Sequence, residues 1–556
     1  MLGAKRKFDI WSAYSLIILA LFLLFLIYPL CHIVAEALTL EDGSLGFARF
    51  VAVFKNSTYL ESLLNGFTVA LLTTSCTLLV GIPFAYFYSF YVVKGSKLLF
   101  TISILSAMSA PFIGAYAWIL LLGRAGELTK LLGLIGIRIG SIYGMQGIVL
   151  VQTTKLYPLV FLYMVGAFRN IDNTLLEASE NLGCTGLKRF AKITMQLSMP
   201  TILAAALLIF MQSFADFGTP LLIGRSFHTF SVEIYNCYMS ETGSDKGLAC
   251  ALSVAAIIIT GVFFLLQKKA SDHYKFSISA LHPVAPKKMK LLQSILVHLY
   301  MYGLAGLSFL PNIYLVYCSF RKVKGQTLFL NEFSLDSYKK AADSMLGRSV
   351  FNTLLIGITG VAIIVIIAVI ISYLTVRRRN SLNSTIDTLS MIPFIMPGSI
   401  VGIALITGFN AGIMNSGVMV MAGTYAIMIV GVVIRRMPYT IRSTTANLMQ
   451  ISMSIEEAAI SLGASKMKTF FVITVPMLKN GVISGAILSF TAIITELSTA
   501  ILLYSNKTVT LTVQTYAQVV KGIYGPACAF SAILLALTAI SVMIYLKVTK
   551  MEDVQI

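Results

Sequence analysis

The chain has 556 residues, of which 57% are hydrophobic and only 12% are charged. Soluble domains carry roughly 25% charged residues, so a series of water-soluble domains is excluded. Intrinsic disorder is excluded because it requires low hydrophobicity. The 7 Cys, and the 40 Gly and 14 Pro without a three-residue period, fit neither a disulfide scaffold nor collagen. Most of the chain is therefore expected to lie in lipid.

Long apolar stretches predict an all-α integral membrane protein. A helix that crosses a bilayer needs about 20 apolar residues, and these stretches lack the alternation of barrel strands. We predict six spans in each half of the chain. They are 11–35, 62–91, 98–122, 143–168, 196–224 and 248–267, then 292–318, 349–376, 384–408, 418–441, 477–503 and 528–546. The first follows Lys5, Arg6 and Lys7 like a secretory signal, but it is too long and has no small-residue cleavage site.

The formal net charge of +19 indicates orientation. Lys and Arg concentrate in segments such as 268–290 and 377–379, which lie inside if the N-terminus is inside. Cytoplasmic loops carry such an excess, so both termini are expected in the cytoplasm. A nucleic-acid partner would need a basic, aromatic-rich soluble face, which the sequence lacks.

The two halves of the chain repeat each other. Residues separated by 280 positions match over a long block, and shorter matches occur at separations of 282 and 287. The pairs include Lys155/Arg435, Glu177/Glu457, Gly183/Gly463, Asp216/Glu496 and Thr219/Thr499, with Pro111/Pro393 at 282 and Tyr86/Tyr373 at 287. We predict a first six-helix repeat at 1–267, a cytoplasmic linker at 268–291 and a second repeat at 292–556. An even number of spans per half makes the repeats parallel, about an axis along the membrane normal.

A motif recurs in the inner loop between the fourth and fifth spans of each half. A short helix is predicted to end at Gly183 in the first loop and at Gly463 in the second. A helix C-cap often requires the left-handed conformation, which Gly adopts without steric cost. Because the motif appears at the matching position in both repeats, we interpret it as functional.

The motif resembles the E-A-A-x-x-x-G signature of the permease subunits of ATP-binding-cassette importers that depend on a binding protein. The second copy reads Glu457-Ala458-Ala459, with Gly463 and then Ile473 and Pro476. The first copy, Glu177-Ala178-Ser179 with Gly183, departs at Ser179 and has Gln196 in place of Pro476. The resemblance covers nearly the whole chain and implies the type I importer permease fold.

The resemblance also implies partners. Each loop helix is expected to dock on one of two copies of an ATPase subunit, and an extracytoplasmic substrate-binding protein is expected to deliver the solute. No G-x-x-x-x-G-K-[ST] phosphate loop occurs in the 556 residues. The chain is therefore expected to be a transport subunit of the bacterial inner membrane, not an enzyme, with no cofactor of its own. ATP and Mg are expected on the ATPase.

The cargo is less sharply indicated. Residues 215–220 and 496–500 are similar to segments of ferric-iron importer permeases. Related permeases for phosphonates, sugar phosphates, thiamine or polyamines share the pattern, so these cargoes stay open.

Ionisable groups within spans are costly and mark candidate pathway residues. Asp216 and Glu496, with Thr219 and Thr499 nearby, are expected to favour a hard cation such as Fe³⁺ at the pathway mouth, or else to cap and pack helices. The matched Lys155 and Arg435 have three interpretations: they snorkel to the inner surface, pair with the loop carboxylates, or line an anion path.

Two other classes stay open from the residues alone. A secondary transporter also uses parallel repeats but would lack the twice-repeated loop motif. A membrane enzyme would need a catalytic cluster, and neither H-E-x-x-H nor G-x-S-x-G occurs.

Overall fold

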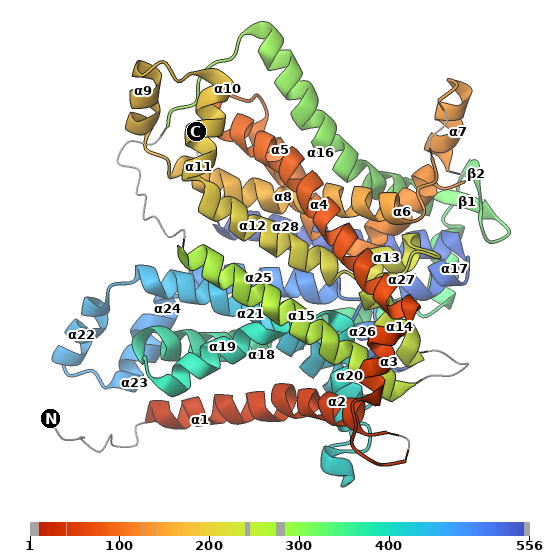
Figure 1. Cartoon of the computed structure of the whole chain (residues 1–556), viewed down its shortest axis with the longest axis vertical. Helices are drawn as coiled ribbons and strands as arrows, with labels where there is room; N and C mark the ends of the chain where they lie inside the picture. Colours follow the sequence, from red (N-terminus) through yellow and green to blue (C-terminus); the bar gives the residue numbers. More distant parts are fainter. Residues whose placement is uncertain are drawn as a thin grey trace. The chain divides into compact units, whose positions relative to one another are not determined.

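The computed structural model describes residues 10–40, 42–124, 126–137, 140–239, 245–273 and 284–549. The basic residues 5–7, residues 274–283 of the predicted linker and the C-terminal residues 550–556 lie outside the described residues. Helices account for nearly all of the regular structure (Figure 1). A small antiparallel hairpin departs from the all-α expectation: β1 (Arg321–Lys324) pairs with β2 (Leu328–Phe333), with Val323 opposite Phe329.

Among the residues that the structure describes, seven helical segments are long and apolar enough to cross a membrane, or up to eleven if each of four bent helix pairs is one span. The seven are Ile10–Leu38, Ser57–Phe90, Met145–Arg169, Lys246–Leu266, Leu291–Ser319, Leu346–Arg377 and Tyr524–Val548. Twelve spans were predicted, and the one that is not among these eleven, 418–441, corresponds to α21 (Tyr425–Gln450). Every 18-residue stretch of α21 contains Arg435, Arg436 and Arg442, which is more charge than an ordinary span carries.

Four breaks interrupt the remaining spans. Helix α5 (Ser96–Met108) meets α6 (Pro111–Leu122), and α19 (Ser381–Ile395) meets α20 (Gly398–Phe409) at 111°. Pro111 starts α6 and Pro397 caps α20, as expected of helix-breaking residues. Pro393 instead lies inside α19, so its predicted equivalence with Pro111 is wrong. The residue that starts the second broken helix is Gly398.

The described chain divides into two compact units. Unit 1 contains residues 10–49, 245–254 and 338–549, and unit 2 contains residues 50–239 and 255–337. Neither unit is one sequence repeat, because unit 1 also contains the first helix of the first repeat and unit 2 also contains the first helix of the second repeat. Helix α15 (Lys246–His273) begins in unit 1 and ends in unit 2.

Unit 2 holds most of the first repeat. Its elements are α4 (Ser57–Phe90), α5, α6, α7 (Glu127–Leu134), α8 (Met145–Arg169), α9 (Asn173–Asn181), α10 (Gly186–Arg189), the π-helix η2 (Phe190–Thr194), α11 (Met195–Leu197), α12 (Met199–Phe214), α13 (Gly218–Ile223), α14 (Phe230–Met239), α16 (Leu291–Ser319), β1 and β2. Helix α3 (Ala48–Lys55) lies at its boundary with unit 1.

Unit 1 holds most of the second repeat. Its elements are α1 (Ile10–Phe22), the π-helix η1 (Leu23–Ile27), α2 (Tyr28–Leu38), α18 (Leu346–Arg377), α19, α20, the 3₁₀-helix η3 (Ile413–Asn415), α21, α22 (Met453–Ser461), α23 (Lys466–Thr469), the π-helix η4 (Phe470–Thr474), α24 (Val475–Met477), α25 (Lys479–Ile494), α26 (Ala500–Leu503), α27 (Leu511–Val520) and α28 (Tyr524–Thr549). Helix α17 (Asp336–Asp343) crosses its boundary.

The N-terminal helix packs on residues of the second repeat. The ring of Trp11 lies 4.5 Å from that of Tyr373 and 5.0 Å from that of Phe470. Farther along, Ser15 Oγ donates to Asn383 Oδ1 at 2.7 Å. These contacts explain why α1 belongs to unit 1.

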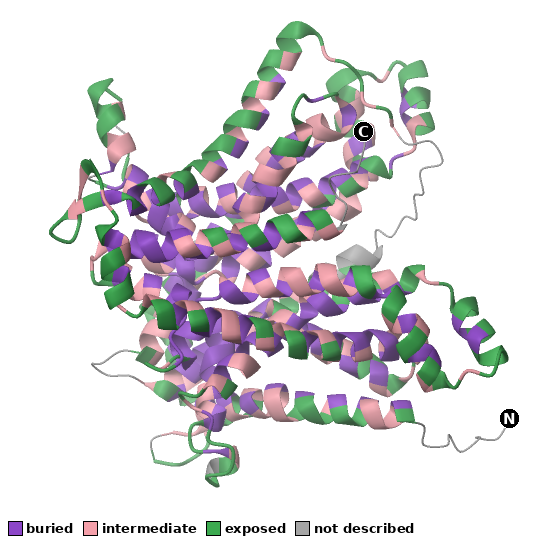
Figure 2. Ribbon diagram, turned by 180° about the vertical axis from the view of Figure 1, so that it is seen from behind, coloured by how far each residue is buried: buried purple, intermediate pink, exposed green. Residues whose placement is uncertain are grey.

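Helix α16 packs on the first repeat in the same manner. Ser308 and Ser106 share a hydrogen bond of 3.0 Å, and the Tyr300 hydroxyl donates to the carbonyl of Val80. Close helix packing in this unit uses small residues: a Cβ on Gly81 of α4 would lie 2.7 Å from Val160 Cβ of α8. Large apolar side chains such as Leu79, Leu299 and Ile366 stay exposed, as lipid-facing positions require. Figure 2 shows exposed and intermediate segments along the long helices.

Candidate coupling loops and intramembrane polar network

The two motif loops fold alike. Helix α9 is capped by Asp172, whose side chain accepts from the Thr174 amide, and α22 is capped by Ser452, which accepts from the Ser454 amide. The caps satisfy amides that a helix start leaves without partners. Both short helices extend past the ends of the long helices of their own unit (Figure 1).

Glycine ends both helices, as predicted. Gly183 has φ +76° and Gly463 has φ +92°. The amide of the following residue closes the turn: Cys184 donates to the Ser179 carbonyl at 2.8 Å, and Ala464 donates to the Ala459 carbonyl at 3.0 Å. This is the Schellman motif, in which a left-handed residue lets the orphan carbonyls of the last turn find donors.

The third position of each motif is buried and the first two are exposed. Glu177 and Ala178, like Glu457 and Ala458, are exposed, whereas Ser179 and Ala459 are buried. The departure at Ser179 is accommodated, because its Oγ donates to the Leu176 carbonyl at 2.7 Å. The exposed Glu177 carboxylate accepts a hydrogen bond from Asn173 Nδ2 at 2.6 Å.

Apolar side chains project from the turn after each helix. Leu182 is 87% exposed and Leu462 is 90% exposed. Leu187 follows in the first loop at 86%. Each loop therefore exposes a large apolar side chain in the same short segment as its exposed motif glutamate, Glu177 or Glu457.

A π-helical segment follows each loop at the same phase. Segments η2 and η4 are 280 residues apart and lead into α12 and α25 after bends of 74° and 65°. Such π segments are rare and often mark functional sites. Sequence analysis did not predict them, because no residue type signals an i→i+5 turn.

The second loop has an ion pair that sequence analysis missed. Glu456, immediately before the motif, is buried and its Oε1 lies 2.9 Å from Arg377 Nε at the end of α18. The Tyr373 hydroxyl donates to Glu456 Oε2 at 3.3 Å. The ring of Tyr373 itself packs against those of Trp11 and Phe470. Glu456 and Glu457 are adjacent and of the same residue type, so the sequence did not indicate which of them is buried. Only the direction in which each one leaves the helix distinguishes them.

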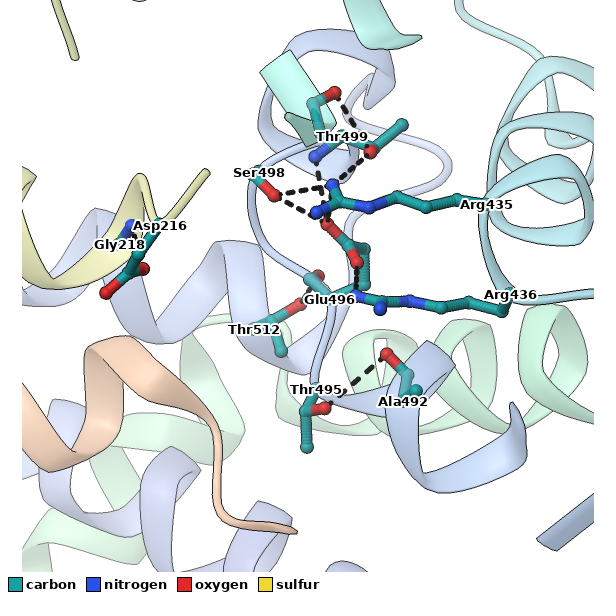
Figure 3. A network of polar contacts seen from close by, with 11 residues as sticks. Asp216, Gly218, Arg435, Arg436, Ala492, Thr495, Glu496, Ser498, Thr499 and Thr512 are labelled. Carbon is teal, nitrogen blue, oxygen red and sulfur yellow. Dashed lines mark hydrogen bonds and ion pairs between the residues drawn. The ribbon is translucent and has the colours of Figure 1, made fainter. Parts of the chain in front are cut away.

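The candidate pathway residues of the second repeat form one polar network (Figure 3). Glu496, buried between α25 and α26, accepts from Arg435 Nη1 at 2.9 Å and pairs with Arg436. Arg435 Nη1 also lies 3.0 Å from Thr499 Oγ1, which donates to the Gly398 carbonyl at 3.0 Å. The network joins α21, the α25–α26 connection and the start of α20.

Asp216 has a different environment in the first repeat. Its Oδ1 accepts from the amides of Gly218 and Thr219 at 3.1 and 3.4 Å, so the carboxylate caps α13. Its Oδ2 accepts from Gln152 Nε2 at 3.0 Å. The capping and packing interpretation therefore has direct geometric support at Asp216. The Thr219 hydroxyl is buried without a hydrogen-bond partner.

The matched basic residues Lys155 and Arg435 also have different surroundings in the two repeats. Arg435 contacts Glu496, not a loop carboxylate. Lys155 lies half-buried in α8, where the first repeat has Leu156 in place of Arg436. Two arginines and one glutamate leave an excess of positive charge in unit 1. Within the described ranges, no group of three or more His, Cys, Asp or Glu is placed to hold a metal ion.

The comparisons with known proteins bear on both repeats. The family described as "Binding-protein-dependent transport system inner membrane component" matches residues 44–271 and again residues 346–550. The chain is 28% identical over 553 residues to a ferric transport system permease protein of Actinobacillus pleuropneumoniae, covering 95% of this chain and 76% of the relative. It is 26% identical to a putative ferric transport system permease protein of Haemophilus influenzae, covering 90% and 79%. A putative 2-aminoethylphosphonate transport system permease protein of Salmonella typhimurium is 28% identical, covering 47% of this chain and 92% of the relative.

Proposed function

The chain belongs to the inner membrane components of binding-protein-dependent transport systems, and from this premise we propose that it is the permease subunit of an importer for ferric iron. The observation that carries the cargo is the similarity to two ferric transport permeases along nearly the whole chain, both repeats included. A relative named for another cargo matches only about half of the chain. Membership of this family favours a transport subunit over a secondary transporter or a membrane enzyme.

The energy source in this proposal is a separate ATPase, present in two copies. One copy docks on α9 and the other on α22, where Glu177 and Glu457 stand beside the exposed Leu182 and Leu462. ATP and Mg are held by the ATPase, and the permease binds no cofactor. A substrate-binding protein delivers the solute to the outer face, and both termini lie in the cytoplasm.

The covalent chain supplies a route for the movement. When the ATPase copies approach each other, they displace α9 and α22. The displacement passes through the glycine turns and π segments to α12 and α25. Asp216 follows the end of α12 by two residues, and Glu496 follows the end of α25 by two residues. Movement at the cytoplasmic loops is thereby converted into rearrangement of intramembrane polar groups.

A second candidate cargo is an oxyanion such as a phosphonate. The observation that favours it is the Arg435–Arg436–Glu496 cluster, in which positive charge exceeds negative charge inside a span. An anion gains from such an excess, whereas a trivalent cation is repelled by it. In the ferric proposal, the carboxylates Asp216 and Glu496 stay candidate pathway groups.

Uptake of radiolabelled ferric iron by iron-starved cells tests the proposal. The strains are wild type, a deletion, and the deletion carrying Glu457→Lys, Gly463→Pro or the control Asp387→Asn. Asp387 forms a half-exposed ion pair with Arg442 away from the loop. Uptake is expected to fall in the deletion and both loop variants and to stay normal in the control.

The other outcomes are equally decisive. Normal ferric uptake in the deletion, in a strain without another ferric importer, contradicts the iron assignment. Loss of growth on 2-aminoethylphosphonate as sole phosphorus source in that strain favours the oxyanion instead. Normal uptake in both loop variants contradicts the docking role of the loops.

A further inference from the structure

The second loop helix is held to the membrane helices by very few side chains. Of the nine residues of α22, only Glu456 and Ala459 are buried. Ala459 offers a single methyl group, so the orientation of the helix depends on Glu456. The Glu456 and Arg377 side chains are 8% and 9% exposed, and each makes further hydrogen bonds.

Arg377 connects three elements at this point. Its Nε donates to Glu456 of α22, and its Nη2 donates to the Ile451 carbonyl, just after α21, at 2.7 Å. Arg377 is itself the last residue of α18, a helix of 32 residues. Tyr373, one turn earlier, donates to Glu456 and lies 4.8 Å from Phe470, the first residue of η4. The loop helix, the long helix and the π segment therefore meet at one ion pair.

The first loop is held differently. Helix α9 also buries two residues, Leu176 and Ser179. Leu176 stands 280 positions before Glu456, and Phe90 stands 287 positions before Arg377. Both belong to one apolar cluster. Its ion pairs are exposed instead: Glu180 with Arg189 at 2.9 Å, and with Lys287 at 4.0 Å.

These two anchors transmit force unequally. Apolar burial is non-directional, so α9 can roll on its contact without losing it. A charge-assisted hydrogen bond has a fixed distance and direction, and a buried pair resists separation because each charge would be left uncompensated. Helix α22 is therefore tied to α18 in one orientation.

We propose that Arg377 and Glu456 are positioning residues that couple the second loop helix to α18, and that the two loops contribute unequally to transport. The proposal rests on the proposed docking role of the loops and deepens it. ATPase movement at α22 is transmitted directly to α18, whereas movement at α9 is partly lost at its apolar anchor.

The decisive variant replaces the second anchor by the first. Arg377→Phe with Glu456→Leu installs the residue types that the first repeat has at the matching positions. Removing both charges together avoids an uncompensated buried charge, which protects folding. The complex of permease, ATPase and ⁵⁵Fe-loaded binding protein is reconstituted in proteoliposomes. The measurements are the amount of assembled complex, ATP hydrolysis, and iron transported per ATP hydrolysed.

The double variant is expected to assemble normally while iron transported per ATP falls about ten-fold, within the range of changes seen along coupling networks. The control Asp387→Asn is expected to leave the ratio unchanged. A wild-type ratio in the assembled double variant overturns the proposal. If the double variant does not assemble, Glu456→Gln carries the decision, because it keeps the volume and an acceptor oxygen: a lowered ratio supports the proposal and an unchanged ratio overturns it.

Failure of the docking role can be told apart from failure of the positioning role. Glu457→Lys is measured in the same vesicles. If it reduces ATPase association while the anchor variants behave as wild type, only the inference about Arg377 and Glu456 fails. If Glu457→Lys also behaves as wild type, the proposed docking function fails.

Discussion

Glu456 and Glu457 are adjacent carboxylates on one helix, yet the first is buried against Arg377 and the second faces outward. A helix turns about 100° per residue, so neighbouring positions look in different directions. The two glutamates therefore differ in their contribution to stability.

Glu456→Ala is expected to destabilise the protein by about 3–5 kcal/mol, because Arg377 is left buried without its partner. Glu457→Ala is expected to stay within about 0.5 kcal/mol of wild type, as surface substitutions do. Thermal unfolding of detergent-solubilised protein measures both. Equal melting temperatures for the two variants would contradict the buried pair.

Gly398→Ala is expected to disrupt the intramembrane network. A Cβ at this position would lie 1.3 Å from Arg435 Nη1 and 2.3 Å from Ser498 Oγ, so Arg435 must leave Glu496. The expected result is a loss of uptake and a lower melting temperature. Gly306→Ala in α16 is the matched control, because nothing lies within 4 Å of its Cβ position. A wild-type phenotype for Gly398→Ala would refute the placement of Arg435.

Gly463→Ala tests the left-handed turn after α22. The Cβ position is empty, so the cost is purely conformational, about 1–2 kcal/mol. Gly463→Pro is expected to be worse, since the Gly463 amide donates to the Ile460 carbonyl at 2.9 Å and proline removes that donor. Uptake in vesicles should decrease in the order wild type, Ala, Pro. Gly303→Ala, which is helical and unobstructed, serves as the reference.

Glu496→Gln is expected to be far more damaging than Asp216→Asn. Glutamine removes the negative charge that Arg435 and Arg436 both contact in the span, at about 3–5 kcal/mol. Asp216 accepts hydrogen bonds from the neutral Gln152 side chain and from the Gly218 amide, and an asparagine oxygen can still accept from that amide. The amount of folded protein in the membrane measures the difference. Comparable amounts for the two variants would mean that the arginines have other counter-charges.

Trp11→Ala is expected to cost about 3–5 kcal/mol through the cavity left between Tyr373 and Phe470. Trp11→Phe is expected to be mild, because the indole Nε1 is buried without a hydrogen-bond partner and only ring packing is at stake. Thermal unfolding of the two variants measures the difference in their stability. Strong destabilisation by Trp11→Phe would indicate that the indole nitrogen does have a hydrogen-bond partner.

Much of this architecture could be predicted from patterns of short range. Apolar length located the helices, and the 280-residue repeat located both loops. Gly183 and Gly463 were predicted correctly because a backbone conformation that only glycine favours leaves a local signal. The span 418–441 was predicted from its apolar length in spite of Arg435 and Arg436, whereas α21 extends to Gln450 and also contains Arg442.

Features that depend on partners could not be predicted. The affinity of α1 for Tyr373 and Phe470 has no signature within α1, since an apolar helix in lipid associates by shape and not by a hydrophobic driving force. The pairing of Pro111 with Pro393 was wrong, because the short sequences that follow the two prolines are alike although the prolines occupy different places in the fold. The break in the second repeat falls at Met396 and Pro397. Glu496 was assigned a role from its own charge, before its arginine partners were known.

The contact between Trp11 and Phe470 sets an order for biosynthesis. Translation proceeds at about 5–20 residues per second, so α1 enters the membrane and then waits roughly 20–90 seconds before its binding surface has been made. During that interval α1 lacks the packing partners that it has in the folded protein. A truncated product that ends after the first repeat can never complete this contact, and its first helix stays open to degradation.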